Sequence, residues 1–312
     1  MNSRIEFELI EHLRAILPPL AMPQGTIAIG DDCAVLPSAN DGYQLVTTDL
    51  LMEGTHFLGD QHSPEQIAAK LFGVNLSDIA AMGGIPTALF LSVALPKSHG
   101  RQYAASLYAA FAQQAQKYGL PILGGDTNSW DGPLVVNATV LGTASAFGPV
   151  LRSGGQPGDV LYVSGPLGGS LAGRHLSPVP QLELGLWLAE NFMPSAMLDI
   201  SDGLLADLQH LLGNDVHGAR LQASQIPIHF DATNCGDDRS PLEHACNDGE
   251  DFELLFALTP QKAEEMEAKI KEQPFGAGVR QIGVLAAEQG TYVLDEQGKD
   301  IEIARGGWTH EL

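Results

Sequence analysis

Strand-like and helical patterns alternate in both halves of this chain, and a break rich in glycine and proline separates the halves. The strand-like runs lie at 44–48, 86–96, 122–123, 134–142, 160–164 and 196–200, and the helical runs lie at 4–17, 63–82, 101–118 and from 204 onward. Alternation of this kind is typical of α/β and α+β proteins. No clear internal sequence repeat accompanies it.

The break covers residues 152–159, which read Arg-Ser-Gly-Gly-Gln-Pro-Gly-Asp. A chain of 312 residues suits two domains, because a typical domain has roughly 150 residues. We therefore predict an N-terminal domain of residues 1–148 and a C-terminal α/β domain of residues 149–312.

The composition excludes several classes of function. Asp and Glu number 38 and Lys and Arg 16, which gives a formal net charge of −22. Nucleic-acid binding needs clustered Lys and Arg, so we expect no nucleic-acid partner. No apolar run approaches the ~18 residues of a membrane-spanning helix, and the three scattered cysteines fit a reducing compartment. We expect a cytoplasmic protein with no membrane partner.

The helical run at 63–82 has a clear start and carries one acid on its apolar stripe. It begins with Ser63-Pro64-Glu65-Gln66, which supplies a capping serine, a proline at the first helical position and a capping-box glutamine. The stripe consists of Ile67, Leu71 and Val74. The next position at this spacing is Asp78, so its carboxylate faces the core. Because a buried unpaired carboxylate is costly, we expect Asp78 to be neutralised, to bind a metal ion, or to pair with Lys70 or Arg101.

Four other acidic segments share one setting, with Gly, Ser or Thr beside the acid and a predicted strand end close by. They are Gly30-Asp31-Asp32, Thr47-Thr48-Asp49, Gly124-Gly125-Asp126-Thr127 and Asp199-Ile200-Ser201-Asp202-Gly203. Small neighbours leave backbone N–H groups accessible, and ligands of α/β proteins bind beyond strand ends. Any one of these acids could be an ordinary turn or helix cap. Four in one chain favour an oxygen-lined site for Mg²⁺ shared with substrate phosphates.

Several common catalytic motifs are missing from the sequence. It contains no GxxxxGK[ST] loop, no GxGxxG that opens a βαβ unit, no GxSxG elbow and no HExxH helix. The segment Gly165-Pro166-Leu167-Gly168-Gly169 is a weak phosphate-loop candidate, and a plain turn explains it equally well. Nucleophilic hydrolysis and zinc catalysis therefore have no support in the sequence.

Seven segments, in the same order along the chain, resemble thiamine-monophosphate kinases. They are Ile29–Val35, Thr47–Asp49, Glu53–Phe57, Val74–Gly83, Gly124–Thr127, Leu198–Leu204 and Gly249–Leu254. The wider superfamily includes aminoimidazole-ribonucleotide synthetase, selenophosphate synthetase and hydrogenase-maturation proteins, and it shares the acidic segments. The Asn75–Gly83 and Gly54–Phe57 segments together indicate the thiamine branch.

The resemblance implies a two-domain, synthetase-like α/β (α+β) fold and a homodimer that forms through the N-terminal mixed sheet, with ATP and Mg²⁺ bound in that domain. It implies in-line transfer of a phosphoryl group from ATP to thiamine monophosphate, assisted by several Mg²⁺ ions, in thiamine diphosphate biosynthesis. The implied metal ligands are Asp32, Thr47, Thr48, Asp49, Asp78, Asp126, Asp199 and Asp202. The implied ATP contacts are Gly125, Asp126, Arg152 and Ser201. The implied substrate contacts are His56, Glu250 and Trp308, and the implied catalytic residues are Asp126 and Asp202.

Elementary electrostatics agrees with this implied reaction. Donor and acceptor are both phosphates, so their repulsion is a large part of the barrier. An acidic protein lowers that barrier when divalent cations bridge its carboxylates and the phosphate oxygens. Arg152 can add a fixed positive fork, and Trp308 can stack on a thiazolium or pyrimidine ring. A structural role for His56 and a packing role for Trp308 stay open.

One segment, Ala172–Gln181, departs from the family pattern. It is short, and Ser177 and Gln181 stand where relatives often carry arginines. Two alternatives therefore remain beside the kinase: a related ATP-dependent synthetase with another acceptor, and a non-catalytic protein that binds Mg²⁺-nucleotide or thiamine phosphate. Residues 1–25 contain no cysteine of the kind that selenide chemistry needs.

Overall fold

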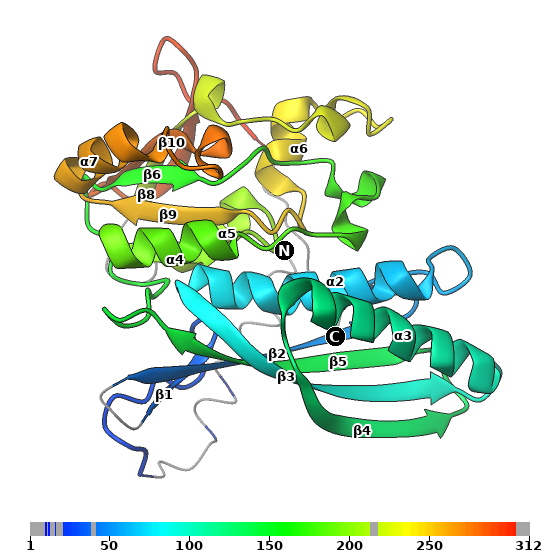
Figure 1. Ribbon diagram of the computed structural model, residues 1–312. Helices are drawn as coiled ribbons and strands as arrows, with labels where there is room; N and C mark the ends of the chain where they lie inside the picture. The colour runs from blue at the N-terminus through cyan, green and yellow to red at the C-terminus, as the bar shows by residue number, and fades with distance from the viewer. Residues whose placement is uncertain are drawn as a thin grey trace.

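The computed structural model describes residues 10, 12, 16, 21–38, 42–212 and 218–303. Most of the expected helix at 4–17 and all of Trp308 lie outside the described residues. Two sheets with helices packed against them make up the described part of the chain (Figure 1), and this mixed α/β architecture confirms the expected fold class. Within the described ranges, no helix is long and apolar enough to cross a membrane.

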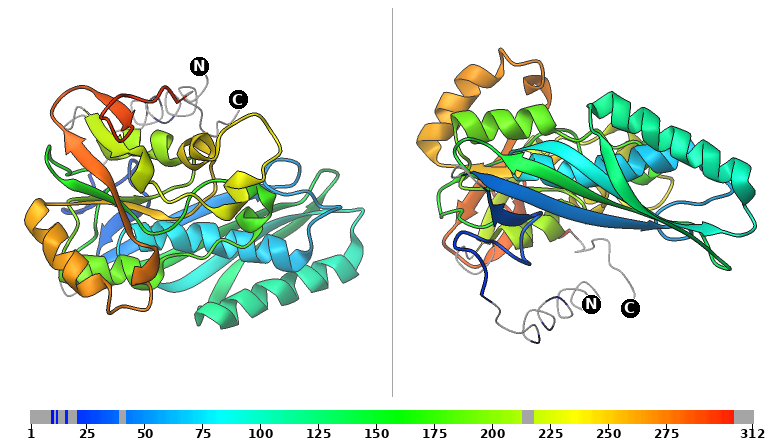
Figure 2. Two further views of the ribbon diagram at one scale, coloured as in Figure 1. Left: turned by 90° about the horizontal axis from the view of Figure 1, so that it is seen from above. Right: turned by 60° about the horizontal axis from the view of Figure 1, so that its bottom comes forward.

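The first sheet has five strands in the order β1-β2-β5-β3-β4. They are β1 (Ala34–Pro37), β2 (Tyr43–Met52), β3 (Gly84–Pro96), β4 (Ile122–Trp130) and β5 (Val135–Ala144). Strands β3 and β4 pair in parallel, and the other neighbours are antiparallel. Helices α2 (Pro64–Ala81) and α3 (Gly100–Tyr118) lie over one face and share its hydrophobic core (Figures 1 and 2).

The second sheet has six strands in the order β11-β8-β10-β6-β9-β7, and only β11 and β8 pair in parallel. The strands are β6 (Val160–Val163), β7 (Ala196–Asp199), β8 (Gly218–Gln222), β9 (Leu254–Leu258), β10 (Arg280–Ala286) and β11 (Gly290–Leu294). One face packs against α4 (Leu182–Asn191) and α7 (Pro260–Ile270), and the other against α5 (Leu204–Leu212) and α6 (Pro241–Asn247). Short 3₁₀ turns lie at Ser170–Ala172, Arg174–Leu176, Ala223–Gln225, Phe230–Thr233 and Gly276–Gly278.

Helix α2 joins the two sheets, because it contacts β2, β3 and β5 on one side and β7 and α4 on the other. Its capping box is present as the sequence predicts, with Ser63 and Gln66 bonded to each other's backbone N–H groups. Helices α2 and α4 approach closely at Gly185, where a Cβ atom would lie 2.1 Å from the Ala80 carbonyl oxygen. The residues that α2 presents to the second sheet are therefore held at a fixed position.

Two expectations about strand ends are wrong. Residues 47–49 lie inside β2 instead of at its end, and Gly124–Thr127 form part of β4 instead of a turn. The ladder between β3 and β4 continues from Leu89 to Pro96, with Asp126 opposite Ser92. This pairing keeps both glycines within the strand. Gly125 has φ +150°, and a Cβ atom there would lie 1.6 Å from the Leu91 carbonyl oxygen. The glycine pair thus permits close strand pairing here.

Candidate active site

Three carboxylates from separate segments meet where the two sheets adjoin. Asp32 lies just before β1, Asp78 in the last turn of α2, and Asp199 at the end of β7. One ligand oxygen from each lies within 4.8 Å of the others. Asp49 of β2 joins them through a hydrogen bond with Asp78, which requires a proton on one of the two groups. We call these four residues the carboxylate cluster.

Polar side chains of α2 fix the cluster in place. The Asp49 backbone N–H donates to Asn75 Oδ1 at 3.1 Å, and Ser77 Oγ donates to Asp199 Oδ2 at 2.5 Å. Asn75 and Ser77 are both fully buried. Sequence reasoning did not assign either residue to the site, although both belong to the Asn-Leu-Ser-Asp segment that carries the family resemblance. A buried polar residue beside a metal-ligand candidate is the signal that could have found them.

The inward direction predicted for Asp78 is confirmed. The Thr47 hydroxyl donates a hydrogen bond to its carboxylate. Lys70, one candidate ion-pair partner, contacts Glu250 instead, and Arg101 lies on the exposed side of α3. Asp78 thus faces other carboxylates and a hydroxyl group, and neither of the two candidate ion-pair partners lies beside it.

Burial and mutual repulsion change the protonation of the cluster. Burial, opposed by the hydrogen bond with Asp78, raises the pKa of Asp49 to about 6. Burial and the neighbouring Asp32 raise the pKa of Asp199 to about 7. For Asp78, burial and then the charges of Asp49, Asp199 and Asp32 raise the pKa well above its usual range. The metal-free cluster is therefore a place where negative charge is disfavoured and a cation is favoured.

The donor set fits a hard divalent cation. Asp32 Oδ2 is buried and has no hydrogen-bond partner among the described residues, so it is available as a ligand. The neighbouring Cys33 is a poor thiolate donor, because burial and then the charge of Asp78 raise the pKa of its thiol well above the usual value. An oxygen-only group of carboxylates is typical of Mg²⁺ and Ca²⁺ sites.

Arg152 lies against the edge of this cluster. Its guanidinium Nη2 donates to Asp32 Oδ1, its Nε lies 3.8 Å from Asp31 Oδ1, and its backbone N–H donates to Asp31 at 3.2 Å. Burial and then the charge of Asp32 raise the pKa of Asp31 to about 6, although the charge of Arg152 acts in the opposite direction. Arg152 therefore supplies the positive charge at this edge of the site, and part of its guanidinium is already engaged by carboxylates.

A second group that could hold a metal ion adjoins the first. Asp202, Asp207 and His210 each offer one ligand atom within 4.8 Å of the others. Asp207 Oδ2 accepts from the backbone N–H groups of Asp202 and Gly203, at 2.9 and 3.0 Å, so it fixes the turn before α5. Burial and then the charge of Arg152 lower the pKa of His210 to about 4, which leaves the ring neutral and able to ligate. The sequence analysis missed Asp207 and His210.

Two neighbouring cavities open beside these groups. The larger, about 250 Å³, is lined by Asp49, Leu50, Leu51, His56, Val74, Asp78, Asp199, Ser201, Asp202, Glu250 and Phe252. The smaller, about 70 Å³, is lined by Thr55, His56, Leu171, His175, Gly249 and Glu250. His56 and Glu250 line both, so they form the wall that the two cavities share. The predicted substrate contacts His56 and Glu250 thus lie beside the predicted metal ligands.

The segment Gly249–Glu253 closes this wall with an unusual backbone. Glu250 has φ +62° and Phe252 has φ +52°, which non-glycine residues seldom adopt. The Glu250 N–H donates to the Ser201 carbonyl at 2.6 Å, and the Phe252 N–H donates to the Ile200 carbonyl at 2.8 Å. These bonds tie the segment to the end of β7, and strained backbone of this kind is common at functional sites.

The carboxylate of Asp251 points away from the cavities. Its side chain is fully buried, and it accepts from Arg174 Nη2 at 2.9 Å and from the Gly168 N–H at 2.8 Å. Arg174, from the short Ala172–Gln181 segment, also lies 3.9 Å from Asp231. The Gly168 and Gly169 N–H groups bond to Asp251 and Asp248. Carboxylates therefore occupy the N–H donors of Gly168 and Gly169, and the Leu167 N–H donates to the Pro227 carbonyl at 2.8 Å. These bonds favour a structural turn over a phosphate loop.

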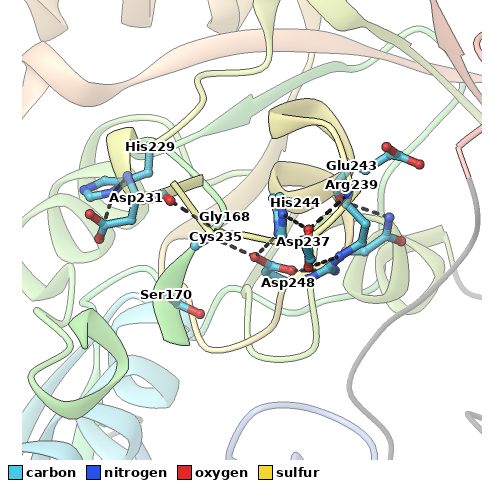
Figure 3. A network of polar contacts seen from close by, with 12 residues as sticks. Gly168, Ser170, His229, Asp231, Cys235, Asp237, Arg239, Glu243, His244 and Asp248 are labelled. Atoms are coloured by element: carbon cyan, nitrogen blue, oxygen red, sulfur yellow. Dashed lines mark hydrogen bonds and ion pairs between the residues drawn. The ribbon is translucent and has the colours of Figure 1, made fainter. Parts of the chain in front are cut away.

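Figure 3 shows the ionic network around Asp248. Cys235, His244 and Asp248 each offer a ligand atom within 4.8 Å of the others. His244 lies between two carboxylates, 2.9 Å from Asp248 and 3.0 Å from Asp237, and Arg239 forms an ion pair with each of them. The arginine already neutralises charge here, so the network is a set of satisfied ion pairs that supports the turn at Gly169.

Three predicted site residues do not join the cluster within one chain. Asp126 lies on the exposed edge strand β4, where it accepts from the Thr127 N–H and the Asn128 side chain. Gly125 lies beside it. Thr48 points to the opposite side of β2 from Thr47, because it bonds to Thr139 while Thr47 bonds to Asp78.

Comparison with known proteins defines the class first. Residues 30–144 match the family model described as AIR synthase related protein, N-terminal domain. Among solved structures, a complex named AaThiL with AMPPCP and TMP superposes with TM-score 0.80 and 27% identity, over 98% of this chain and 97% of that one. A hydrogenase maturation protein HypE in complex with ATP, at 18% identity and TM-score 0.67, shares the fold. Residues 30–144 thus match an AIR-synthase-related N-terminal domain, and the chain shares its fold with these two structures.

Closer relatives then give the family. A thiamine-monophosphate kinase of Rhodopirellula baltica is 37% identical over 300 residues, which cover 93% of this chain and 92% of the relative. The thiamine-monophosphate kinase of Buchnera aphidicola subsp. Schizaphis graminum is 34% identical over 90% of this chain and 91% of the relative. The chain belongs to the thiamine-monophosphate kinase family, and it is a kinase.

Proposed function

We propose that this enzyme transfers the γ-phosphoryl group of ATP to the phosphate of thiamine monophosphate, giving thiamine diphosphate. The observation that carries the proposal is the carboxylate cluster, where Asp32, Asp78 and Asp199 converge within 4.8 Å beside a cavity of about 250 Å³. The names of close relatives, and the solved complex with an ATP analogue and TMP, support this choice of substrates.

The cluster and its neighbours would hold several Mg²⁺ ions. Asp32, Asp49, Asp78 and Asp199 would provide one set of ligands, with the Thr47 hydroxyl adjacent, and Asp202 would provide a ligand from the turn before α5. When bound, Mg²⁺ would neutralise the phosphate charges that oppose in-line transfer. We assign a catalytic role to Asp202, which lines the larger cavity together with Asp78.

The protein's own groups would orient the two phosphates. Arg152 and Ser201 line the cavity of about 80 Å³ that adjoins the cluster, and this position supports a role for both in binding ATP. His56 and Glu250 lie on the wall shared with the smaller cavity, on the side where the organic part of the acceptor would lie. In this proposal the phosphates would bind next to the carboxylates, and the thiamine rings would bind away from them. Positioning alone lowers the barrier substantially in transfers of this type.

We further propose a homodimer that forms through the face of the first sheet opposite α2 and α3. Leu50, Met52, Ile85 and Phe90 are exposed on β2 and β3. The register places Asp126 in the same cross-strand row as Ser92, Asn137 and Leu50, on this same face. A second copy packed here would cover the apolar side chains. It would also bring Asp126 and Gly125 of each copy toward the other copy's site, which accounts for their distance from the cluster within one chain.

The test of the proposed function is direct. Purified protein is incubated with ATP, Mg²⁺ and thiamine monophosphate, and the thiamine phosphates are separated by chromatography. We expect thiamine diphosphate in an amount equal to the ADP formed, no product in EDTA, and little product with unphosphorylated thiamine. Failure to form thiamine diphosphate under these conditions excludes the proposal. A cytoplasmic location remains a prediction, which cell fractionation tests.

A further inference from the structure

A buried lysine lies behind the wall that separates the two cavities. The Lys70 side chain on α2 is 1% exposed, and its ammonium group lies 2.7 and 2.8 Å from the two carboxylate oxygens of Glu250. It also donates to the His56 carbonyl oxygen at 2.8 Å. Lys70 therefore contacts both residues that line both cavities.

These contacts use the whole donor capacity of the lysine. An ammonium group has three N–H donors, and Lys70 directs them to Glu250 Oε1, Glu250 Oε2 and the His56 carbonyl. No donor is left for a substrate, and Lys70 is not among the residues that line either cavity. Any effect of Lys70 on the reaction therefore has to pass through the groups that it holds.

Glu250 is fixed from two directions. Its backbone, at φ +62°, is tied to Ser201 by a hydrogen bond of 2.6 Å. Its carboxylate is fixed by both contacts with Lys70. The carboxylate is 20% exposed, so it reaches the cavity while one side remains bonded to the lysine. Each carboxylate oxygen retains a second lone pair for a ligand.

Charge explains why this pairing matters at this site. The larger cavity already contains the carboxylates of Asp49, Asp78, Asp199 and Asp202. An unpaired Glu250 would add another negative charge close to where a phosphorylated substrate binds, and like charges in a partly buried site repel strongly. Lys70 neutralises Glu250 and still leaves its oxygens as hydrogen-bond acceptors.

We propose that Lys70 is a positioning residue, which holds the Glu250 carboxylate and the His56 backbone so that Glu250 accepts hydrogen bonds from N–H groups of the acceptor substrate. This inference rests on the proposed function, because it takes thiamine monophosphate as the acceptor. It assigns Lys70 to acceptor recognition and leaves ATP binding to the residues around Arg152 and Ser201.

The test compares steady-state kinetics of Lys70→Met, Lys70→Arg, Glu250→Gln and the double variant Lys70→Met/Glu250→Gln. We expect Lys70→Met to raise the KM for thiamine monophosphate about tenfold and to change the KM for ATP less than about twofold. Lys70→Arg should recover part of the acceptor affinity. The double variant should be no worse than the poorer single variant, because Lys70 acts through Glu250.

Lys97→Met is the matched control, since Lys97 forms an exposed ion pair of 2.7 Å with Asp131. It should leave both KM values unchanged. Thermal melts establish whether each variant folds. If Lys70→Met does not fold, the double variant still tests the inference, because replacing both Lys70 and Glu250 leaves no unpaired charge. Calorimetric titration with thiamine monophosphate gives binding without turnover.

The outcomes separate this inference from the proposed function. No turnover of thiamine monophosphate by the wild type contradicts the proposed function. Wild-type turnover with an unchanged acceptor KM in Lys70→Met contradicts the role of Lys70 alone. Equal increases in the KM for ATP and the KM for the acceptor also contradict it. So does a double variant in which the effects of Lys70→Met and Glu250→Gln multiply.

Discussion

Ser77 on α2 donates a hydrogen bond of 2.5 Å to Asp199 at the end of β7. The first residue belongs to the helix packed on the first sheet and the second to a strand of the second sheet, so this bond joins the two halves of the site. The donor is neutral, so the bond adds no positive charge beside Asp199. The raised pKa of Asp199, about 7, follows mainly from its burial and from the nearby Asp32.

The first prediction concerns the pH dependence of stability in EDTA. The folded-state pKa values of Asp199 and Glu253, both about 7, lie above the usual values for unfolded chains, so the folded protein binds more protons. The stability that these groups contribute is present below the unfolded pKa of about 4 and is lost as pH rises from there to the folded pKa of about 7. We expect these groups to lower the melting temperature over this range and to add no further slope above about pH 7.5. His210, with its pKa lowered from 6.5 to about 4, acts in the opposite direction below about pH 6.5, so the fall should be clearest between about pH 6 and about pH 7.

One variant and one ligand check the origin of this effect. Asp199→Asn should flatten the slope, because it removes one of the titrating groups. Excess Mg²⁺ should also flatten or reverse it, since deprotonated carboxylates bind the ion better. A slope that is the same in EDTA, in Mg²⁺ and in Asp199→Asn would show that the cluster does not control stability.

The second prediction concerns Asp126. Asp126→Asn should lower kcat by about 10²–10³-fold and leave the melting temperature nearly unchanged, because the residue is exposed on an edge strand. Near-normal kcat/KM in the variant would remove Asp126 from the mechanism.

Mixing subunits tests whether Asp126 acts across the dimer. A heterodimer of Asp126→Asn and Asp78→Asn chains would contain one site with both wild-type residues and one site with neither. Random exchange of the two inactive variants should then restore about a quarter of wild-type activity. No recovery after confirmed exchange would mean that each site is complete within one chain.

The sequence predicted the structure correctly where a local rule decides which way a side chain points. A helix has 3.6 residues per turn, so the stripe of Ile67, Leu71 and Val74 was enough to predict that Asp78 faces inward, and this is confirmed. The capping box likewise placed the start of α2.

The sequence was less informative where tertiary pairing decides. Gly-Gly-Asp-Thr is compatible with a turn or a strand, and only the ladder with β3 makes it part of β4. Which of Thr47 and Thr48 faces the cluster depends on which face of β2 the helices cover. The role of Ser77 depends on Asp199, a partner distant in sequence. The role of Asp207 depends on the geometry of the turn at Asp202, which single residues do not reveal.

The third prediction concerns the ion pair between Arg174 and Asp251. The Asp251 side chain is fully buried, whereas that of Arg174 is 24% exposed. Arg174→Met leaves a buried carboxylate without its cation and should lower the free energy of unfolding by about 3 kcal/mol, the lower end of the range for buried pairs. Chemical denaturation measures this change. Adding Asp251→Asn should recover part of it, and Lys97→Met should cost less than about 1 kcal/mol. A loss no larger than that of Lys97→Met would show that the pair does not hold the Gly249–Glu253 segment.

The fourth prediction distinguishes the kinase from a synthetase with another acceptor. The larger cavity is lined by acids that would bind metal and by His56, whose Nδ1 already accepts from the Met52 N–H at 3.0 Å. We therefore expect phosphate release from ATP without thiamine monophosphate to be at most about 1% of the kinase rate. The measurement is a phosphate-release assay with and without the acceptor. Comparable rates in both assays would favour an ATPase or a different acceptor.

The fifth prediction is that Asp78→Asn has opposite effects on stability and activity. In the metal-free protein, burial and the charges of Asp49, Asp199 and Asp32 all disfavour the ionised Asp78 carboxylate. Replacing it with an amide removes this repulsion, so the melting temperature in EDTA should rise or stay the same. The Thr47 hydroxyl can still donate to the amide oxygen, which limits any loss of packing.

The same substitution should weaken the response to ligands. Stabilisation by Mg²⁺ plus ATP depends on affinity, so the increase in melting temperature on adding both should shrink in Asp78→Asn, and activity should fall by about 10²-fold or more. The experiment is a pair of melts, in EDTA and in excess Mg²⁺–ATP, for the wild type and the variant. The exposed substitution Asp131→Asn serves as a control and should change neither melt. If Asp78→Asn instead sharply destabilises the EDTA form and preserves the Mg²⁺–ATP increase, Asp78 is a structural residue, and its assignment as a metal ligand is wrong.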